Sequence, residues 1–479
     1  MNLWIIPLTL TLLTLSLYSI RRTPLALFTT RTPEAAVLWH LETLPIWLSA
    51  AALGSGLLPP DNLLGHLAPQ TLIRSTLLIL VALATLHLVL GLLLRLSHPT
   101  PSHTSNASLD QPHIPPTYLY VCTLSCLAAL LLFPLAGYRH ATLYSLITGT
   151  PLLEVRLHNA YHTSLPSQLL SMPTAVAYFT ACIAGRLVHS HRAGSWLALG
   201  AALLFVSARG DKAPVLKTLL LYIVASLATS PSKQATVRSL RIVLCTAALL
   251  FVLGGLLRLQ YANFGFGRLL AYLTERTGAQ LQGTYLTFAL SDAGFSWPST
   301  AWQSMLPAFA RSADFIDFHR FLMLYYTGQP EDRVGAMSTL FIAEAYAIGG
   351  TLLLWLSPIV VGCSITASFY LWNIVLKRLA SIETPAVASA LCILSSPLSS
   401  HFSAFPTLKT TLLWLTLLLP LIVTTRLIDL LRENKPTHGS TFARTPSPAQ
   451  HSTTGLRRKT RRRPSGKADL PDLPGCTNS

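Results

Sequence analysis

The chain has 479 residues, of which 51% are hydrophobic and only 11% charged, and its formal net charge is +17. Soluble domains carry about a quarter charged residues, so this composition excludes an ordinary soluble globular protein. Apolar stretches of about 17 to 25 residues, the length that crosses a bilayer core, recur along most of the chain. They lack the alternation of a membrane β-barrel, so the sequence predicts an all-α polytopic integral membrane protein.

The apolar segments, taken in chain order, predict about eleven transmembrane helices. Cytoplasmic loops carry an excess of Lys and Arg, and the basic C-terminal tail is expected to be cytoplasmic. When the spans are counted back from that tail, most Lys and Arg in short loops fall on the cytoplasmic side, and the N-terminus falls outside. The predicted spans are 3–20, 35–58, 71–96, 117–136, 169–188, 195–208, 213–230, 241–257, 351–376, 386–403 and 410–428.

A first polar segment outside these spans is LLEVRLHNAYH. It places Glu154, His158 and His162 on one face at helical spacing, a pattern that can bind zinc. No fourth ligand converges on it in the sequence. We therefore expect an interfacial helix with its histidines at the lipid headgroups, and we expect no metal site in this chain.

A second polar segment is FVSARGDKAPV, which puts Arg209, Asp211 and Lys212 between two apolar runs. Each charge would cost roughly 2.5 to 3.5 kcal/mol at the centre of a bilayer, so the segment must lie at an interface or in a wet cavity. Gly210 suits a tight turn between two helices. The predicted topology puts this corner outside, where its charges either bind a ligand or mark the membrane surface.

The segment 258–337 forms the longest predicted loop, also outside. A loop of this length is usually functional or structured in its own right. RLQYANFGFGRLLAYLTERTG predicts an interfacial amphipathic helix, and Trp297 and Trp302 are expected at the headgroup level. The loop also carries acids and arginines, among them Asp292, Asp314, Asp317, Glu331, Asp332, Arg276, Arg311, Arg320 and Arg333.

The segment TGQPEDRVGAMSTLFIAEAYAIGG then returns to the membrane. It carries a single acid, Glu344, inside an otherwise uncharged run. A carboxylate at that depth needs a partner or a water-filled cavity, so Glu344 is a candidate functional residue. Pairing with an arginine to stabilise the fold is the alternative interpretation.

The C-terminal stretch 435–479 holds nine Lys or Arg and two Asp and includes RRKTRRR. Few apolar residues accompany these charges, so we expect disorder. A contact with anionic membrane lipid is favoured over a nucleic-acid arm. The predicted organisation is a membrane domain over 1–434, with the large outward-facing loop at 258–337, followed by a cytoplasmic tail over 435–479.

The order of these features resembles the bacterial oligosaccharide repeat-unit polymerases, which build O-antigen and enterobacterial common antigen. The resemblance covers roughly residues 170 to 430. Asp211 and Lys212 depart from it, because uncharged residues are expected there. Three motifs carry the resemblance. They are S-x5-E-x-Y-x2-G-G at Ser338, Glu344, Tyr346, Gly349 and Gly350, the following IVVG ending at Gly362, and the earlier Arg-Gly at Arg209 and Gly210.

The resemblance implies glycosyl transfer at the periplasmic face of the bacterial inner membrane. A growing glycan on undecaprenyl pyrophosphate would move to an incoming lipid-linked repeat unit, without a metal or cofactor. The protein would contact membrane lipids, and its further partner would be a chain-length regulator. Fixed cations would bind the pyrophosphate, and a carboxylate or histidine would serve as base. The candidate cations are Arg209, Lys212, Arg276, Arg311, Arg320 and Arg333, and the candidate catalytic residues are Glu344, Asp292, Asp317 and His319.

Two other classes of function stay open. An O-antigen ligase has a similar body plan and uses the same lipid donor, but it transfers the glycan to the lipid A core. A transporter or flippase would also be polytopic and basic. The sequence shows no clear inverted repeat and no matched pair of broken helices, which disfavours a transporter. The absence of a D-x-D motif disfavours a nucleotide-sugar transferase.

Overall fold

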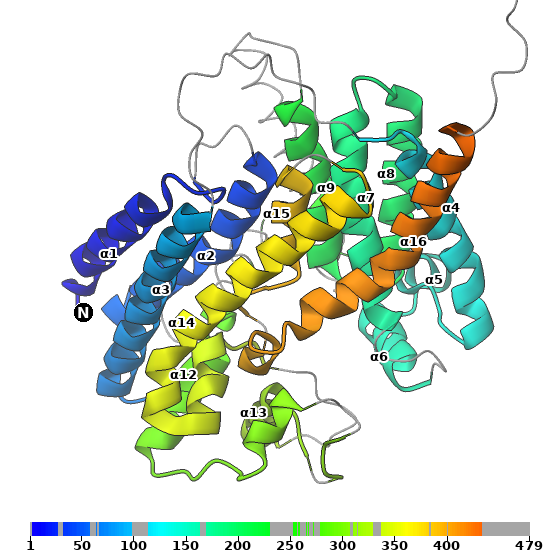
Figure 1. Cartoon of the computed structure of the whole chain (residues 1–479). Helices are drawn as coiled ribbons and strands as arrows, with labels where there is room; N and C mark the ends of the chain where they lie inside the picture. The colour runs from blue at the N-terminus through cyan, green and yellow to red at the C-terminus, as the bar shows by residue number, and fades with distance from the viewer. Residues whose placement is uncertain are drawn as a thin grey trace, which may run out of the picture. The chain divides into compact units, whose positions relative to one another are not determined.

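The computed structural model describes residues 2–26, 32–57, 64, 67–97, 114–162, 169–229, 278–306, 310–313, 315–328, 337–382, 385–399 and 401–433, with a few positions between 252 and 272. Every regular element in these residues is an α or 3-10 helix, which confirms the predicted all-α class (Figure 1). The predicted tail over 435–479 lies outside the described residues.

Helices occupy ten of the eleven predicted spans, and the span 241–257 lies largely outside the described residues. The apolar runs therefore located the helices well. The ten are α1 (Ile5–Ile20), α2 (Pro33–Ser55), α3 (Pro69–Ser97), α4 (Thr117–Leu132), α7 (Met172–Leu187), α8 (Arg192–Ser207), α9 (Lys212–Ala228), α14 (Phe341–Arg378), α15 (Pro385–Leu394) and α16 (Lys409–Glu433).

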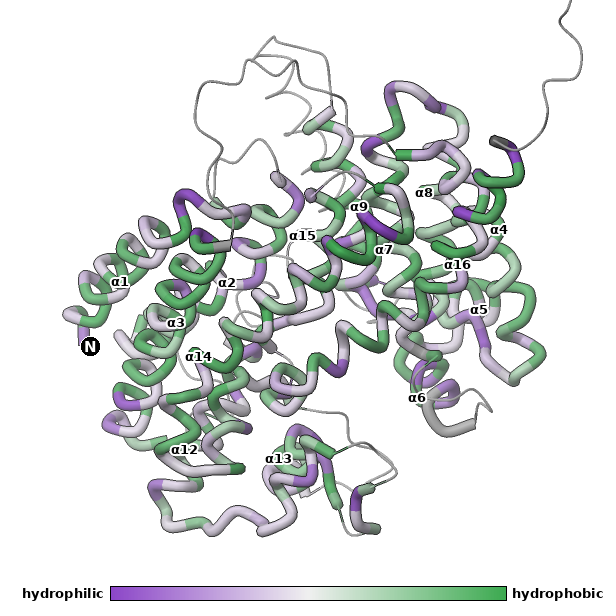
Figure 2. The backbone as a smooth tube through the Cα atoms, viewed as in Figure 1, coloured by the Kyte–Doolittle hydropathy of each residue, from purple (hydrophilic) through white to green (hydrophobic). Residues whose placement is uncertain are grey.

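Five helices in the described part of the chain are long and apolar enough to cross a membrane. They are α2, α3, α4 with the 3-10 turn η1 (Phe133–Ala136) that follows it, α14 and α16. Large apolar side chains such as Leu92 and Leu131 remain exposed on these helices, as expected for surfaces that face lipid. Figure 2 shows hydrophobic residues along the helices and hydrophilic ones mainly near their ends. The protein is therefore a membrane-embedded helical protein.

Two predicted spans have different boundaries in the structure. The span 351–376 corresponds to α14, which begins earlier at Phe341, and the backbone leaves helical geometry at Gly349 and Gly350. Gly350 adopts a φ of 61°, a conformation that glycine reaches without a steric penalty. The span 386–403 corresponds to α15, which ends already at Leu394. Pro397 disfavours helical geometry at the residue before it, so the apolar run does not continue as a helix.

The two polar segments LLEVRLHNAYH and FVSARGDKAPV are helical and tightly turned, respectively. LLEVRLHNAYH forms α6 (Leu152–His162), as the sequence predicts, and it packs against α5 (Ala141–Thr148). Between α8 and α9 the chain turns at Gly210, which has a φ of 73°. This confirms the predicted tight corner. The N–H of Ala141 donates to the carbonyl of Ala208 at 2.9 Å, so α5 is fixed to that corner.

From residue 278 onwards, the described residues of the long loop pack against the beginning of α14. It forms α12 (Gln282–Asp292), η4 (Ala301–Met305) and α13 (Phe318–Thr327), which lie near one end of α14 (Figure 1). Backbone hydrogen bonds join these pieces. The Gly283 N–H donates to Ser338 O and the Met337 N–H to His319 O, each at 3.1 Å. The loop is thus built into the end of the helical bundle.

Candidate functional site

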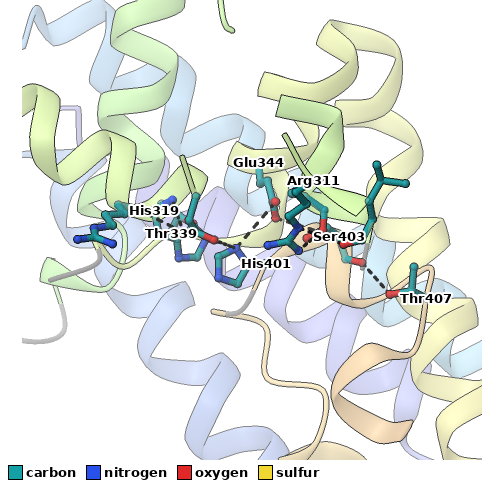
Figure 3. A network of polar contacts seen from close by, with 11 residues as sticks. Arg311, His319, Thr339, Glu344, His401, Ser403 and Thr407 are labelled. Carbon is teal, nitrogen blue, oxygen red and sulfur yellow. Dashed lines mark hydrogen bonds and ion pairs between the residues drawn. The ribbon is translucent and has the colours of Figure 1, made fainter. Parts of the chain in front are cut away.

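Four ionisable side chains meet where the loop, α14 and the chain after α15 come together (Figure 3). They are Asp317, His319, Glu344 and His401, and we call them the acid-histidine cluster. Asp317 is the N-cap of α13, where its Oδ1 accepts hydrogen bonds from the N–H groups of His319 at 3.1 Å and Arg320 at 3.4 Å. An acidic N-cap satisfies N–H groups that the helix leaves free. The cap therefore also positions His319 on the first turn.

Glu344 lies in the first turn of the N-terminal part of α14 and is only 1% exposed. Its Oε2 accepts a hydrogen bond from the Ser403 N–H at 3.3 Å. Its Oε1 accepts none from the described residues. The helix dipole favours a carboxylate at this end of a helix. Glu344 is thus a buried carboxylate with one oxygen still able to accept a proton or a hydrogen bond.

His401 lies between two carboxylates. Its Nδ1 is 3.5 Å from Asp317 Oδ2 and 3.9 Å from Glu344 Oε1. These distances are longer than a normal hydrogen bond, so the imidazole lies close to both carboxylates without a strong hydrogen bond to either. The side chain is 37% exposed, so it connects the buried Glu344 with the surroundings.

His319 is the buried histidine of the cluster. Its Nε2 lies 2.9 Å from the hydroxyl of Thr339, and its ring stacks on His401 with the centroids 4.0 Å apart. Burial, followed by the neighbouring His401, lowers the pKa of His319 to about 3, against the opposing effect of Asp317. His319 is therefore neutral at physiological pH.

This lowered pKa predicts acid lability. Because the unfolded chain binds a proton at His319 below about pH 6.5 and the folded chain only near pH 3, stability is lost as the pH falls through this window. From pH 6.5 to 4.5 the loss from this group is about 2 to 3 kcal/mol. His319→Gln, which keeps an acceptor for Thr339, should flatten the pH dependence of the unfolding midpoint in detergent. The exposed His191→Gln should leave it unchanged, and equal slopes in all three proteins would contradict the prediction.

Two cations border the cluster. The Arg311 guanidinium donates from Nε to Leu306 O at 3.1 Å and from Nη2 to Ser304 O at 3.0 Å, which fixes its orientation (Figure 3). Lys409, the first residue of α16, interacts electrostatically with Arg311, Asp317 and Glu344. Acids, histidines and oriented cations therefore share one place in the fold.

The cluster also has the residue types of a metal site. Ligand atoms of His319, Glu344 and His401 lie within 4.8 Å of one another. The two imidazoles, however, are stacked with their planes only 22° apart. The lone pairs of a ring lie in its plane, so stacked rings do not converge on one ion, and Thr339 already contacts Nε2 of His319. The geometry fits an acid-histidine site better than a metal centre.

The structure brings together four of the predicted site residues: Glu344, Asp317, His319 and Arg311. Arg320 follows His319 on α13. Asp292 lies elsewhere, at the end of α12, where it forms an ion pair with Arg74 and accepts a hydrogen bond from Thr71 at 3.2 Å. Asp292 thus joins α12 to α3, and its role as a candidate base stays a prediction. Arg276, Arg333, Asp314, Glu331 and Asp332 lie outside the described residues.

The corner between α8 and α9 forms a separate group of charges. Asp211 bridges two arginines, since its Oδ1 is 2.6 Å from Arg156 Nη2 and its Oδ2 is 3.0 Å from Arg209 Nε. Lys212 donates to the hydroxyl of Tyr272 at 3.0 Å. Asp211 therefore has a structural role that the sequence left open. Arg156, from α6, is a cation of this group that sequence reasoning missed.

Sequence reasoning also missed His401, Ser403 and Lys409. The prediction placed His401 and Ser403 inside the span 386–403, where they would have been membrane-helix residues. One signal was available: the stretch SSPLSSHFS interrupts the apolar run with a proline and many serines. Such a stretch indicates a break in a helix, and broken helices at membrane depth often line functional cavities.

Comparison of the chain with protein-family models, with curated proteins and with solved structures finds no match. The choice among functions therefore depends on the chemistry of the acid-histidine cluster, its neighbouring cations and the charged corner.

Proposed function

We propose that the protein is a membrane glycosyltransferase that polymerises undecaprenyl-pyrophosphate-linked oligosaccharide repeat units at the periplasmic face of a bacterial inner membrane. One observation carries the proposal: the acid-histidine cluster lies beside Arg311 and Lys409 in a membrane-embedded helical protein. Transfer from a lipid pyrophosphate needs both a base for the acceptor hydroxyl and cations for the leaving group.

In the proposed reaction, the bond between the sugar anomeric carbon and the pyrophosphate oxygen of the donor breaks. Undecaprenyl pyrophosphate leaves with the electron pair, and the acceptor hydroxyl oxygen bonds to the anomeric carbon. Glu344 takes the hydroxyl proton on Oε1, which accepts no hydrogen bond from the described residues. His401, close to this oxygen and partly exposed, then passes the proton towards solvent.

Fixed cations stabilise the charge that develops on the leaving pyrophosphate. Arg311 is already oriented by two backbone carbonyls, so little side-chain ordering is needed when the substrate binds. Lys409 adds a second charge at the same place. In this proposal Arg209 and Lys212 at the corner bind another part of the anionic substrate, with Asp211 holding Arg209 in orientation.

The proposal also includes a topology. The corner and the acid-histidine cluster face the periplasm, as does the N-terminus, and the C-terminus lies in the cytoplasm. The basic stretch 435–479 then contacts anionic lipids of the inner leaflet. The proposal includes a protein that regulates chain length as a partner on the periplasmic side. A reporter fused after Lys212 should therefore read outside, and one fused after Asn434 should read inside.

Arg209→Ala tests the role of the corner. We expect about 10- to 100-fold less polymer, because a charge-assisted hydrogen bond contributes about 1.5 to 3 kcal/mol. Polymer length and amount would be measured on gels after complementation of a strain that lacks the gene. Arg139→Ala is the matched control, because it removes an arginine that stacks over Tyr144 on the neighbouring α5.

The glycan pattern separates the possible outcomes. Accumulation of lipid core capped with a single repeat unit supports a polymerase. Loss of all glycan beyond the core, single-unit capping included, points instead to a ligase. Unchanged polymer length and amount in Arg209→Ala would show that the corner is structural.

A further inference from the structure

A second carboxylate, Glu42, contacts the backbone just before His401. Glu42 is in the middle part of α2, inside a helix that is otherwise apolar enough to span a membrane. Its Oε1 accepts a hydrogen bond from the Leu398 N–H at 2.7 Å, and the backbone of Ser399 also donates to it. Lys217, on α9, attracts it electrostatically. An ionisable residue at such a place suggests a function beyond packing.

Both backbone polar groups of Leu398 form hydrogen bonds. Its N–H donates to Glu42, and its carbonyl accepts a hydrogen bond from the Phe341 N–H at 3.3 Å. Phe341 begins α14 shortly before Glu344, and Leu398 shortly precedes His401 in the chain. One residue therefore links Glu42 to the two backbone segments that carry Glu344 and His401.

This part of the chain needs such an anchor. α15 ends at Leu394, and the described residues between it and α16 form one short 3-10 helix, η7 (Phe402–Ala404). Backbone N–H groups outside a helix must find other partners when they are removed from water. At the α15 end, Trp372 donates to the hydroxyl of Ser395 at 3.2 Å. At the cluster end, the backbone donates to Glu42.

We propose that Glu42 is a positioning residue, which fixes the chain at Leu398 and Ser399 so that His401 lies between Asp317 and Glu344. Lys217 balances the charge of Glu42. The effect of Glu42 on catalysis rests on the proposed function, whereas the anchoring of the backbone does not. Glu42 acts through a hydrogen bond to a backbone N–H, so an uncharged acceptor at the same position should replace it.

A substitution series tests this role. Glu42→Leu removes the acceptor, whereas Glu42→Gln combined with Lys217→Met keeps a carbonyl oxygen and removes both charges. We expect kcat to fall about 100-fold in Glu42→Leu with little change in KM, because misplacing a catalytic group by about 1 Å has an effect of this size. The double variant should stay within about threefold of the wild type. Thr43→Val is the control, since the hydroxyl of this buried neighbour donates to the Trp39 carbonyl of its own helix.

Hydrogen exchange gives a readout independent of activity. In Glu42→Leu, amides of the peptide over 395–408 should exchange at least tenfold faster than in the wild type, while those of α14 beyond Gly350 stay unchanged. Unchanged exchange at 395–408, or a double variant as inactive as Glu42→Leu, would overturn the positioning role. If Glu42→Leu does not fold, the positioning role is tested by the double variant, which should keep both its activity and the wild-type exchange rates at 395–408. The wild-type protein could also show no glycosyl transfer while Glu42→Leu still exchanges faster at 395–408. That result would support the anchoring role of Glu42 and reject the proposed function.

Discussion

Glu344→Gln should lower the rate of glycosyl transfer by about 10²- to 10⁴-fold, the range for loss of a general base. The amide has the same shape as the carboxylate and can still accept the hydrogen bond from the Ser403 N–H, so the fold should be kept. It cannot take up the acceptor proton. The rate would be measured with the purified protein and lipid-linked repeat units, with folding checked by the elution profile and the unfolding midpoint.

Two comparisons sharpen this experiment. Glu154→Gln removes an exposed acid from α6 and should retain full activity. His401→Ala should also be slow, and the double variant with Glu344→Gln should be little slower than either single variant, because residues that act as a unit are not additive. Activity within threefold of the wild type in Glu344→Gln would show that Glu344 serves the fold rather than the reaction.

Glu34→Gln should destabilise the protein by about 3 to 5 kcal/mol, because it removes one of the two charges of a buried ion pair. Arg186 donates to Glu34 from Nε at 2.8 Å and from Nη2 at 2.9 Å, and the two side chains are only 8% and 1% exposed. The substitution leaves the Arg186 charge buried without a counter-charge. The unfolding midpoint in detergent measures the loss.

The matched control removes both charges. Glu34→Leu combined with Arg186→Met should recover most of the stability, since replacing a buried pair by apolar side chains is often neutral. If Glu34→Gln alone is as stable as the wild type, the pair is hydrated and contributes little to the fold.

The helices were predictable because a membrane imposes a simple requirement on sequence. A segment that crosses lipid must satisfy its own backbone and present apolar side chains over a sufficient length. For this reason α1, α3 and α16 lie within a few residues of their predicted spans. The end of α15 was predicted wrongly because apolar composition alone does not report a helix break, whereas Pro397 does.

The candidate site was predictable only in part. Glu344 stood out as a lone acid in an apolar run, and Asp317, His319 and Arg311 as charges in a long loop. His401 did not, because it fell inside a predicted membrane span and its importance comes from two carboxylates on other segments. The partner of Asp292 was hidden for the same reason, since Arg74 is on α3.

The sequence by itself determined the membrane-embedded helical class, the positions of most helices and the tight turn at Gly210, because local composition and backbone freedom decide these features. The tertiary structure alone decided which charges meet. Asp211 bridges Arg209 to Arg156, Arg186 is buried against Glu34, and His401 lies beside Glu344. The physical reason is that ion pairs depend on distance through space, and helix packing sets those distances between residues far apart in the chain.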